Sequence, residues 1–118
     1  TNGAGTIGFA CFAECKKLKS VAIPEGISAI DKSCFANCKK LKQINLPSTL
    51  KTIGENGFYG CTGLRTVTVK GRVTKCKIFA FYKVKNCKII LKTKAAKKSK
   101  KVFAKELKQE GNKKVKIK

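Results

Sequence analysis

Apolar residues recur along this chain at an interval of 23 residues, in three consecutive units that begin at Ile7, Ile30 and Ile53. The residue type at each apolar position is kept from unit to unit, so that Phe, Cys, Leu and β-branched residues form columns. A unit of this length is too short to bury its own apolar face. A fixed period of this size therefore predicts a solenoid of stacked coils.

The end of each unit alternates between apolar and polar residues, as in Val21-Ala22-Ile23 and Val67-Thr68-Val69. Alternation with β-branched residues predicts a short strand with one face inward. Pro24 and Pro47 follow the first two strands and end them, because proline has no N–H for a ladder. At the start of each unit, a small residue, a Phe and a Cys follow one another at intervals that fit a single turn of α-helix or 3₁₀ helix. We expect parallel strands on one face of the solenoid and helical turns on the other.

A fourth unit, from Cys76, departs from the pattern. Phe81 and Ile90 keep their places, whereas Lys92 stands at an expected aliphatic position. The run 89–91 is apolar at every residue, so a slip of one residue would exchange its two faces. Terminal repeats are commonly atypical, because one end of the stack must be closed off from water. We therefore expect about four coils, the last of them degenerate, within residues 1–92.

Residues 93–118 are rich in lysine and predict a C-terminal cap. Ser99 is a candidate N-cap of a helix, and Gly111 is a candidate C-terminal stop. The apolar stripe of that helix would dock on the last coil, and it comprises Val102, Phe103 and Leu107. The final residues 113–118 alternate strictly and predict one more strand.

The pattern Ile-Gly-x-x-small-Phe-x-x-Cys-x-x-Leu-x-x-Ile-x-Leu-Pro over residues 7–75 resembles the BspA-type leucine-rich repeat of bacterial surface proteins. The resemblance implies a right-handed leucine-rich repeat solenoid of the α/β type. It also implies a secreted or cell-surface protein that binds other macromolecules, so an extracellular location is expected from the resemblance alone. The chain departs from the family at Cys11 and Cys34, which stand where Ala is usual, and at Asp31, which replaces Gly.

The formal charge of +22 is distributed unevenly, since residues 70–118 hold nineteen basic and two acidic side chains. Such asymmetry is typical of a surface that meets an anionic partner, although a merely solubilising face would look the same. No apolar run reaches the roughly 18 residues of a membrane span. The chain has no Met and opens within a few residues of a repeat, so we expect a piece of a longer protein.

Seven cysteines and no histidine limit the chemistry that the chain can perform. Cys15, Cys38 and Cys61 lie in one column, which favours buried thiols over a zinc site, while a disulfide between adjacent coils stays open. A nucleophilic cysteine needs a base, typically histidine, and the carboxylates form no evident acid–base pair. We expect no enzyme activity, no cofactor, no metal and no small-molecule substrate.

Binding of a protein or an acidic polysaccharide is the function that remains, and two sets of residues are candidates for it. The first set points outward from the strands and comprises Ser20, Ala22, Gln43, Asn45, Thr66 and Thr68. The second set is basic, lies beside the strands and comprises Lys16, Lys17, Lys19, Lys39, Lys40, Lys42, Arg65 and Lys88. Exposed aromatic residues are not evident among the lysines, so sequence-specific nucleic-acid binding is disfavoured.

Three hypotheses about function follow from these sets. The first is a non-catalytic adhesion or binding module that uses the outward residues and their basic border. The second is an electrostatic polyanion binder (glycosaminoglycan, wall polymer or nucleic acid) that uses the basic C-terminal part. The third is a structural spacer or cap for another domain.

Overall fold

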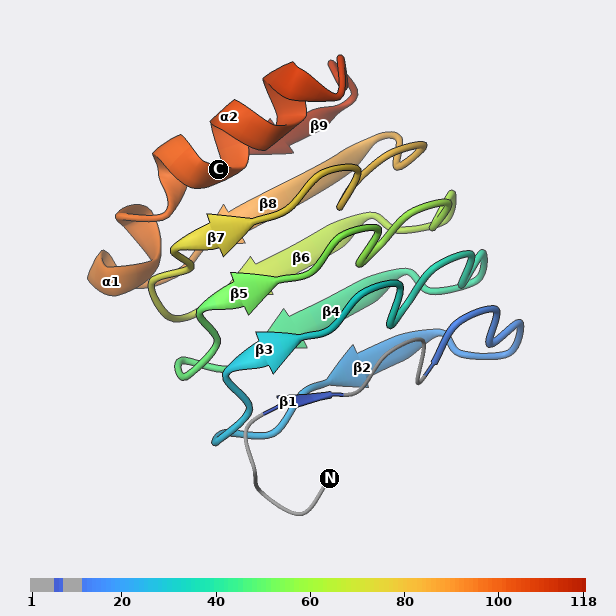
Figure 1. The fold of residues 1–118 in the computed structure, drawn as a ribbon, viewed down its shortest axis with the longest axis horizontal. Helices are drawn as coiled ribbons and strands as arrows, with labels where there is room; N and C mark the ends of the chain where they lie inside the picture. Colours follow the sequence, from blue (N-terminus) through green and yellow to red (C-terminus); the bar gives the residue numbers. More distant parts are fainter. Residues whose placement is uncertain (1–5, 8–11) are drawn as a thin grey trace.

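Two parallel β-sheets run along the stack of coils (Figure 1) in the computed structural model, which describes residues 6–7 and 12–118. The five-stranded sheet has the order β2-β4-β6-β8-β9. Its strands are β2 (Ser20–Ala22), β4 (Gln43–Leu46), β6 (Thr66–Val69), β8 (Cys87–Leu91) and β9 (Val115–Ile117). The four-stranded sheet is β1 (Thr6–Ile7), β3 (Ala29–Ile30), β5 (Thr52–Ile53) and β7 (Lys75–Cys76), in that order.

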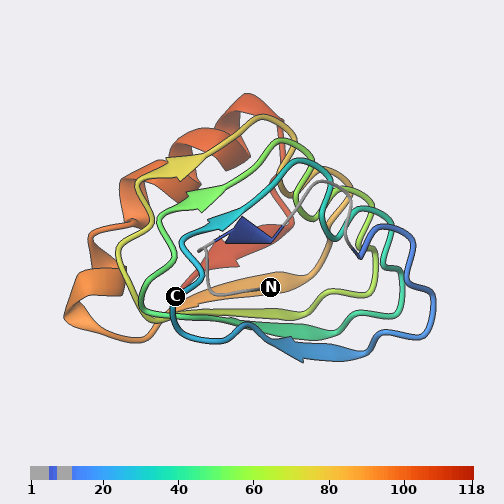
Figure 2. The ribbon, with the colours of Figure 1, turned by 60° about the horizontal axis from the view of Figure 1, so that its bottom comes forward.

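The 23-residue interval of the sequence sets the register of the four-stranded sheet and, through the third coil, of the five-stranded sheet. Ile30 pairs with Ile53, and Ile44 pairs with Val67. Figure 2 looks close to the axis of the stack, where each coil has three sides: one strand from each sheet and a side made of turns. The predicted leucine-rich repeat solenoid is therefore confirmed, with parallel strands stacked coil on coil.

The four-stranded sheet is a feature that the sequence did not predict. Each of its strands has only two residues, for example Thr52–Ile53. A strand this short shows no alternation, so its only trace in the sequence is the Ile that opens each unit. The side chains of Ile30 and Ile53 are 1% and 0% exposed, which places this Ile column in the core.

The side of the coil predicted to be helical consists of turns instead. Their N–H groups donate to carbonyls three residues back, as from Cys38 to Phe35 at 3.3 Å. Two residues in each such turn of the second, third and fourth coils have positive φ, and in the second coil they are Ser33 (58°) and Asn37 (59°). A residue in the left-handed region cannot continue a right-handed helix. The described turns thus have the hydrogen bonds of single 3₁₀ turns but form no helix, so the helical detail of the prediction is not confirmed.

Hydrogen bonds also link the turns of successive coils. The N–H of Phe35 donates to the carbonyl of Gly57 at 3.0 Å, and the N–H of Phe58 donates to the carbonyl of Ala80 at 2.8 Å. Residues on either side of each Phe repeat the pattern, so each coil receives carbonyl acceptors from the coil that follows it. The last coil needs acceptors from another source.

The core is a column of phenylalanine rings flanked by aliphatic columns. Ring centroids lie 5.2 Å apart from Phe12 to Phe35, 5.6 Å from Phe35 to Phe58 and 5.5 Å from Phe58 to Phe81, each pair stacked. Phe103 of the cap closes the column edge-on, 6.0 Å from Phe81. Four of these five rings are fully buried, and Phe12 at the first coil is partly buried.

The fourth coil reaches the paired part of its long strand one residue earlier than the other coils do. Val67 pairs with Ile89 and Val69 pairs with Leu91, an offset of 22 residues. Ile89 and Leu91 therefore point inward, and Ile90 points outward. A strict count of 23 residues would turn Ile90 inward and give Lys92 an aliphatic position, but the apolar run 89–91 left this register open. The observed pairing resolves it one residue earlier.

Two helices and β9 close the end of the stack (Figure 1): α1 (Lys94–Lys97) and α2 (Lys100–Gln109). Phe103 and Leu107 of α2 are buried against the last coil, as the apolar stripe predicts. Ser99 precedes α2, but its hydroxyl makes no capping bond. Its Oγ instead accepts from the N–H of Val73 at 2.8 Å and donates to the carbonyl of Gly71 at 3.4 Å, which fastens the cap to the coil.

Candidate functional site

The outward side chains of the five-stranded sheet form two rows across the coils. One row runs Ser20, Gln43, Thr66, and the other runs Ala22, Asn45, Thr68. The structure thus brings all six predicted partner-binding residues onto one face, where they are exposed or half-buried. They are small, uncharged and capable of hydrogen bonding, apart from Ala22.

The same rows continue towards the cap with different chemistry. Lys88 lies opposite Thr66, and Lys116 of β9 lies opposite Lys88. Lys88 therefore belongs to the outward face of the sheet, one of the two places that the sequence left open for it; the other was the border column of Lys19 and Lys42. The earlier pairing of the fourth coil decides between the two places. The face is neutral at its N-terminal end and basic at the cap.

The predicted basic border lies where each coil passes from its turns into the long strand. The border comprises Lys16, Lys17, Lys19, Lys39, Lys40, Lys42 and Arg65, and every one of these side chains is exposed. Among the described residues, the one ion pair joins Lys32 to Glu55 at 3.9 Å, and neither residue belongs to the border. The ammonium groups of the border are thus left to solvent or to an anionic partner.

Arg65 differs from the lysines because its guanidinium is bound to the backbone. Its Nη1 donates to the carbonyls of Thr62, Leu64 and Lys85 at 3.1–3.2 Å. These bonds tie the turn of the third coil to the fourth. Arg65 supports the border and offers less of its charge to a ligand than the lysines do.

A hollow of about 460 Å³ opens in the border between the first two coils. Three border lysines line it together with two residues that have positive φ, and the full lining is Glu14, Lys16, Asn37, Lys39 and Lys40. The ammonium groups favour an anionic group in this hollow, whereas the exposed Glu14 carboxylate would repel an anion placed next to it.

The cysteine column is part of the core. The thiols of Cys38 and Cys61 are fully buried and donate to the carbonyls of Phe12 and Phe35, at 2.9 and 3.0 Å. Burial raises the pKa of Cys38, and it raises the pKa of Cys61 to about 12. A thiol with such a pKa stays protonated at neutral pH and is a poor nucleophile.

The other described cysteines lie in the core or pack against it, and Cys34 is fully buried. Cys15 and Cys76 are half-buried free thiols, and Cys87 is a buried one whose pKa burial raises to about 12. Cys11 lies outside the described residues. Nowhere in the described part of the chain do three or more Cys, Asp or Glu residues gather as they would around a metal ion.

Two carboxylates, those of Glu106 in α2 and of Glu110 directly after it, meet at the last coil, although the sequence showed no evident pair. Glu106, which is 1% exposed, accepts the N–H of Phe79 at 3.0 Å, and Glu110 accepts the N–H of Phe81 at 3.4 Å. These side chains replace the carbonyls that a further coil would supply. Burial, and then the neighbouring Glu106, raises the pKa of Glu110 to about 8. The i, i+4 spacing of the two residues on a helix was the available signal.

Exposed aromatic side chains, which the sequence did not reveal, lie beside this cap. Phe79 and Tyr82 are 39% and 36% exposed, and Tyr82 stacks on Tyr59 of the preceding coil. The expectation that aromatic residues do not accompany lysines on an exposed face was wrong here. The signal for these rings is a break in the repeat, since the equivalents of Tyr59 and Tyr82 in the first two coils are Ala13 and Ala36.

Comparison with known proteins bears on the whole chain. The family model described as a BspA-type leucine-rich repeat region matches residues 2–110, in six copies. Neither the curated proteins nor the solved structures gave a match. In the described residues, no helix is both long enough and apolar enough to cross a membrane.

Proposed function

Because the chain belongs to the BspA-type leucine-rich repeat family, whose solenoid is a scaffold for protein interaction, we propose that it binds an acidic partner along the long sheet. The site is the outward face with rows Ser20–Gln43–Thr66 and Ala22–Asn45–Thr68, together with the basic border. The partner is an acidic protein surface or an anionic polymer. Since this family is typically found on bacterial surfaces, we propose adhesion at the cell surface as its setting.

One observation carries this proposal: the border lysines recur in register, and none of them forms an ion pair within the described residues. Adjacent coils lie about 5 Å apart. Like charges at that spacing repel each other by up to about 1 kcal/mol per pair in water. Nothing in the packing of the coils calls for lysine there, because these side chains are exposed. An acidic partner would relieve this repulsion between the lysines. Its attraction to them would raise both the affinity and the association rate.

The outward rows suit the central part of such an interface. Ser, Thr, Asn and Gln side chains can donate and accept hydrogen bonds, and they carry no charge that would have to be desolvated. The border then lies at the rim, where charges steer the partner and set the register of binding. A partner with a polar strip flanked by carboxylates fits this arrangement.

The test uses two triple variants that remove the same charge at different places. The border variant is Lys19→Ser, Lys39→Ser and Lys42→Ser, and the cap variant is Lys98→Ser, Lys101→Ser and Lys108→Ser. Binding of fluorescent poly-L-glutamate and of heparin is measured over a salt series. We expect the border variant to weaken binding at least tenfold and the cap variant to have a small effect. Equal effects of the two variants would refute the border as the site.

The same experiment separates the second candidate, which is polyanion binding by the C-terminal lysines. That candidate is favoured by the exposure of the α1 and α2 lysines, and it predicts that the cap variant alone weakens binding. Removal of residues 93–118 would not be a fair test. Phe103 and Leu107 are part of the core, and the Glu106 carboxylate accepts a backbone N–H of the last coil, so the truncated chain would lose stability.

A further inference from the structure

The most exposed large apolar side chains of the described residues lie together in the turns of the last coil. Ile78, Phe79 and Tyr82 are 51%, 39% and 36% exposed. The Phe79 and Tyr82 rings are tilted with centroids 5.0 Å apart, and Tyr82 stacks on Tyr59 at 5.5 Å. We refer to Tyr59, Phe79 and Tyr82 as the aromatic patch.

Packing of the coils does not account for the aromatic patch. The core beneath these turns is already filled by Phe58 and Phe81, both fully buried. The first two coils form the same turn with Ala13 and Ala36 where the later coils have tyrosine. Exposed apolar side chains that gather in one place commonly mark a binding surface.

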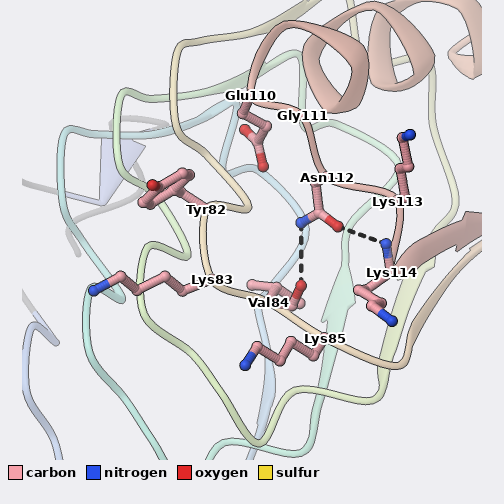
Figure 3. Close-up of a pocket in the computed structure, with 9 residues that line it drawn as sticks. All are labelled: Tyr82, Lys83, Val84, Lys85, Glu110, Gly111, Asn112, Lys113 and Lys114. Carbon is pink, nitrogen blue, oxygen red and sulfur yellow. Dashed lines mark hydrogen bonds between the residues drawn. The ribbon is translucent and has the colours of Figure 1, made fainter.

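A hollow of about 360 Å³ adjoins the patch at Tyr82 (Figure 3). One side of the hollow is the last turn of the fourth coil, residues 82–85, and the other is the loop 110–114 of the cap. Tyr59 stacks on one face of the Tyr82 ring, and Phe79 packs tilted against the same ring. The Tyr82 side chain extends from the rim of the hollow away from the cap loop (Figure 3), so a flat group at this rim would pack against the exposed part of the ring.

Four lysines line the hollow and give it a positive charge: Lys83, Lys85, Lys113 and Lys114. Figure 3 shows Lys83 extending away from the cap loop, and its Nζ lies 5.8 Å from the centroid of the Tyr59 ring. The only carboxyl in the lining is that of Glu110. Burial beside Glu106 raises the pKa of Glu110 to about 8, so this group is largely neutral at pH 7 and does not repel an anion.

The hydrogen-bonding groups of the hollow argue against a sugar ligand. The Asn112 amide donates to the carbonyls of Phe81 and Val84 at 2.9 and 3.1 Å, and its oxygen accepts from the N–H of Lys114 at 2.9 Å (Figure 3). The amide is thus committed to holding the loop and is not available for hydroxyl groups. What the hollow offers is an aromatic ring and ammonium groups, which suit a flat ring joined to a negative charge.

We propose that the aromatic patch and this hollow bind single-stranded nucleic acid, with a base stacked on Tyr82 and phosphates beside Lys85 and Lys114. Stacking on aromatic side chains within a basic groove is the usual mode of binding single strands without sequence preference. The absence of a free amide in the described lining agrees with sequence-tolerant binding. This site uses the turns and the cap, so it stands apart from the sheet face of the proposed function.

The tyrosines provide a direct signal for the test. The chain has two tyrosines and no tryptophan, and both tyrosines belong to the aromatic patch. Tyrosine emission therefore reports on the site alone. Titration with a short oligodeoxythymidylate should quench this emission and should raise the anisotropy of a fluorescein label on the oligonucleotide. No quenching at low salt would overturn the proposal.

Substitutions then separate stacking from charge. Tyr82→Ala should weaken binding roughly 5- to 150-fold, the range expected for one stacked base, whereas Tyr82→Phe keeps the ring and should bind nearly as the parent chain does. Lys85→Ser with Lys114→Ser should lower the salt slope of log affinity by about 0.7 per lysine. A Tyr82→Ala protein that unfolds at the same urea concentration and binds unchanged would refute the stacking.

Two further measurements identify the ligand class and the site. Lys16→Ser with Lys39→Ser removes the same charge at the border and should leave oligonucleotide quenching unchanged. Heparin and poly-L-glutamate should quench the tyrosines far less than the oligonucleotide does. Equal quenching by either polymer would refute nucleic acid as the preferred ligand. This result does not depend on the sheet face, because binding of poly-L-glutamate there would not quench the tyrosines.

Discussion

Substitution of Glu106 by alanine should destabilise the cap, because this carboxylate stands in for a missing coil. In the inner coils, the N–H that corresponds to that of Phe79 donates to a carbonyl of the next coil, as from Asn56 to Ile78 at 3.1 Å. In the last coil the acceptor is Glu106, which is almost fully buried. Hydrogen bonds to charged groups are worth about 1.5–3 kcal/mol, and alanine leaves the N–H without its acceptor. We expect Glu106→Ala to cost about 1.5–3 kcal/mol.

Equilibrium urea unfolding measures this cost, and Glu106→Gln is the matched control. Glutamine keeps an oxygen that can accept the Phe79 N–H and loses only the charge, so it should cost less than about 1 kcal/mol. If Glu106→Gln destabilises the protein as much as Glu106→Ala does, the charge and not the acceptor matters. If Glu106→Ala costs under about 0.5 kcal/mol, the carboxylate does not replace the carbonyls of a further coil.

Three more predictions concern the core and the cap. Phe35→Ala should cost about 3–5 kcal/mol of unfolding free energy, since the ring is fully buried between two others, and a loss below about 1 would contradict that position. Cys38 and Cys61 should react slowly with a thiol reagent in the native protein and fast in urea; fast native labelling would contradict their burial. Because the pKa of Glu110 rises from 4.5 to about 8 on folding, stability should fall as pH increases between these values, and Glu110→Gln should flatten that slope.

The repeat made the coils and their faces predictable. The same residue type recurs at a given position in three units, so an inward or outward assignment must hold for all three. The alternation around Ile44 and Val67 therefore identified the inward face of the long sheet. The lysines between the Leu column and the strands were likewise predictable as a border. The absence of helix from the described turns could not be predicted, because the left-handed conformation of Ser33 and Asn37 leaves no mark in apolar spacing.

Features that break the repeat could not be placed from the sequence. The register of 89–91 depends on one missing residue, which an all-apolar run conceals. The i, i+4 spacing of Glu106 and Glu110 is compatible with an ordinary solvated helix face, and only docking of α2 brings both to the end of the stack. Tyr59 and Tyr82 meet because coils stack in register, yet their exposure depends on how the cap loop closes.

The ladder of hydrogen bonds from each coil to the next has a mechanical consequence. Each coil is held by its two neighbours, so a force applied along the chain would detach coils from an end instead of shearing the whole stack at once. Each release would add about 80 Å of contour, from 23 residues at about 3.5 Å each. Pulled at its two ends, such a molecule would lengthen in steps and absorb work while its remaining coils stay folded.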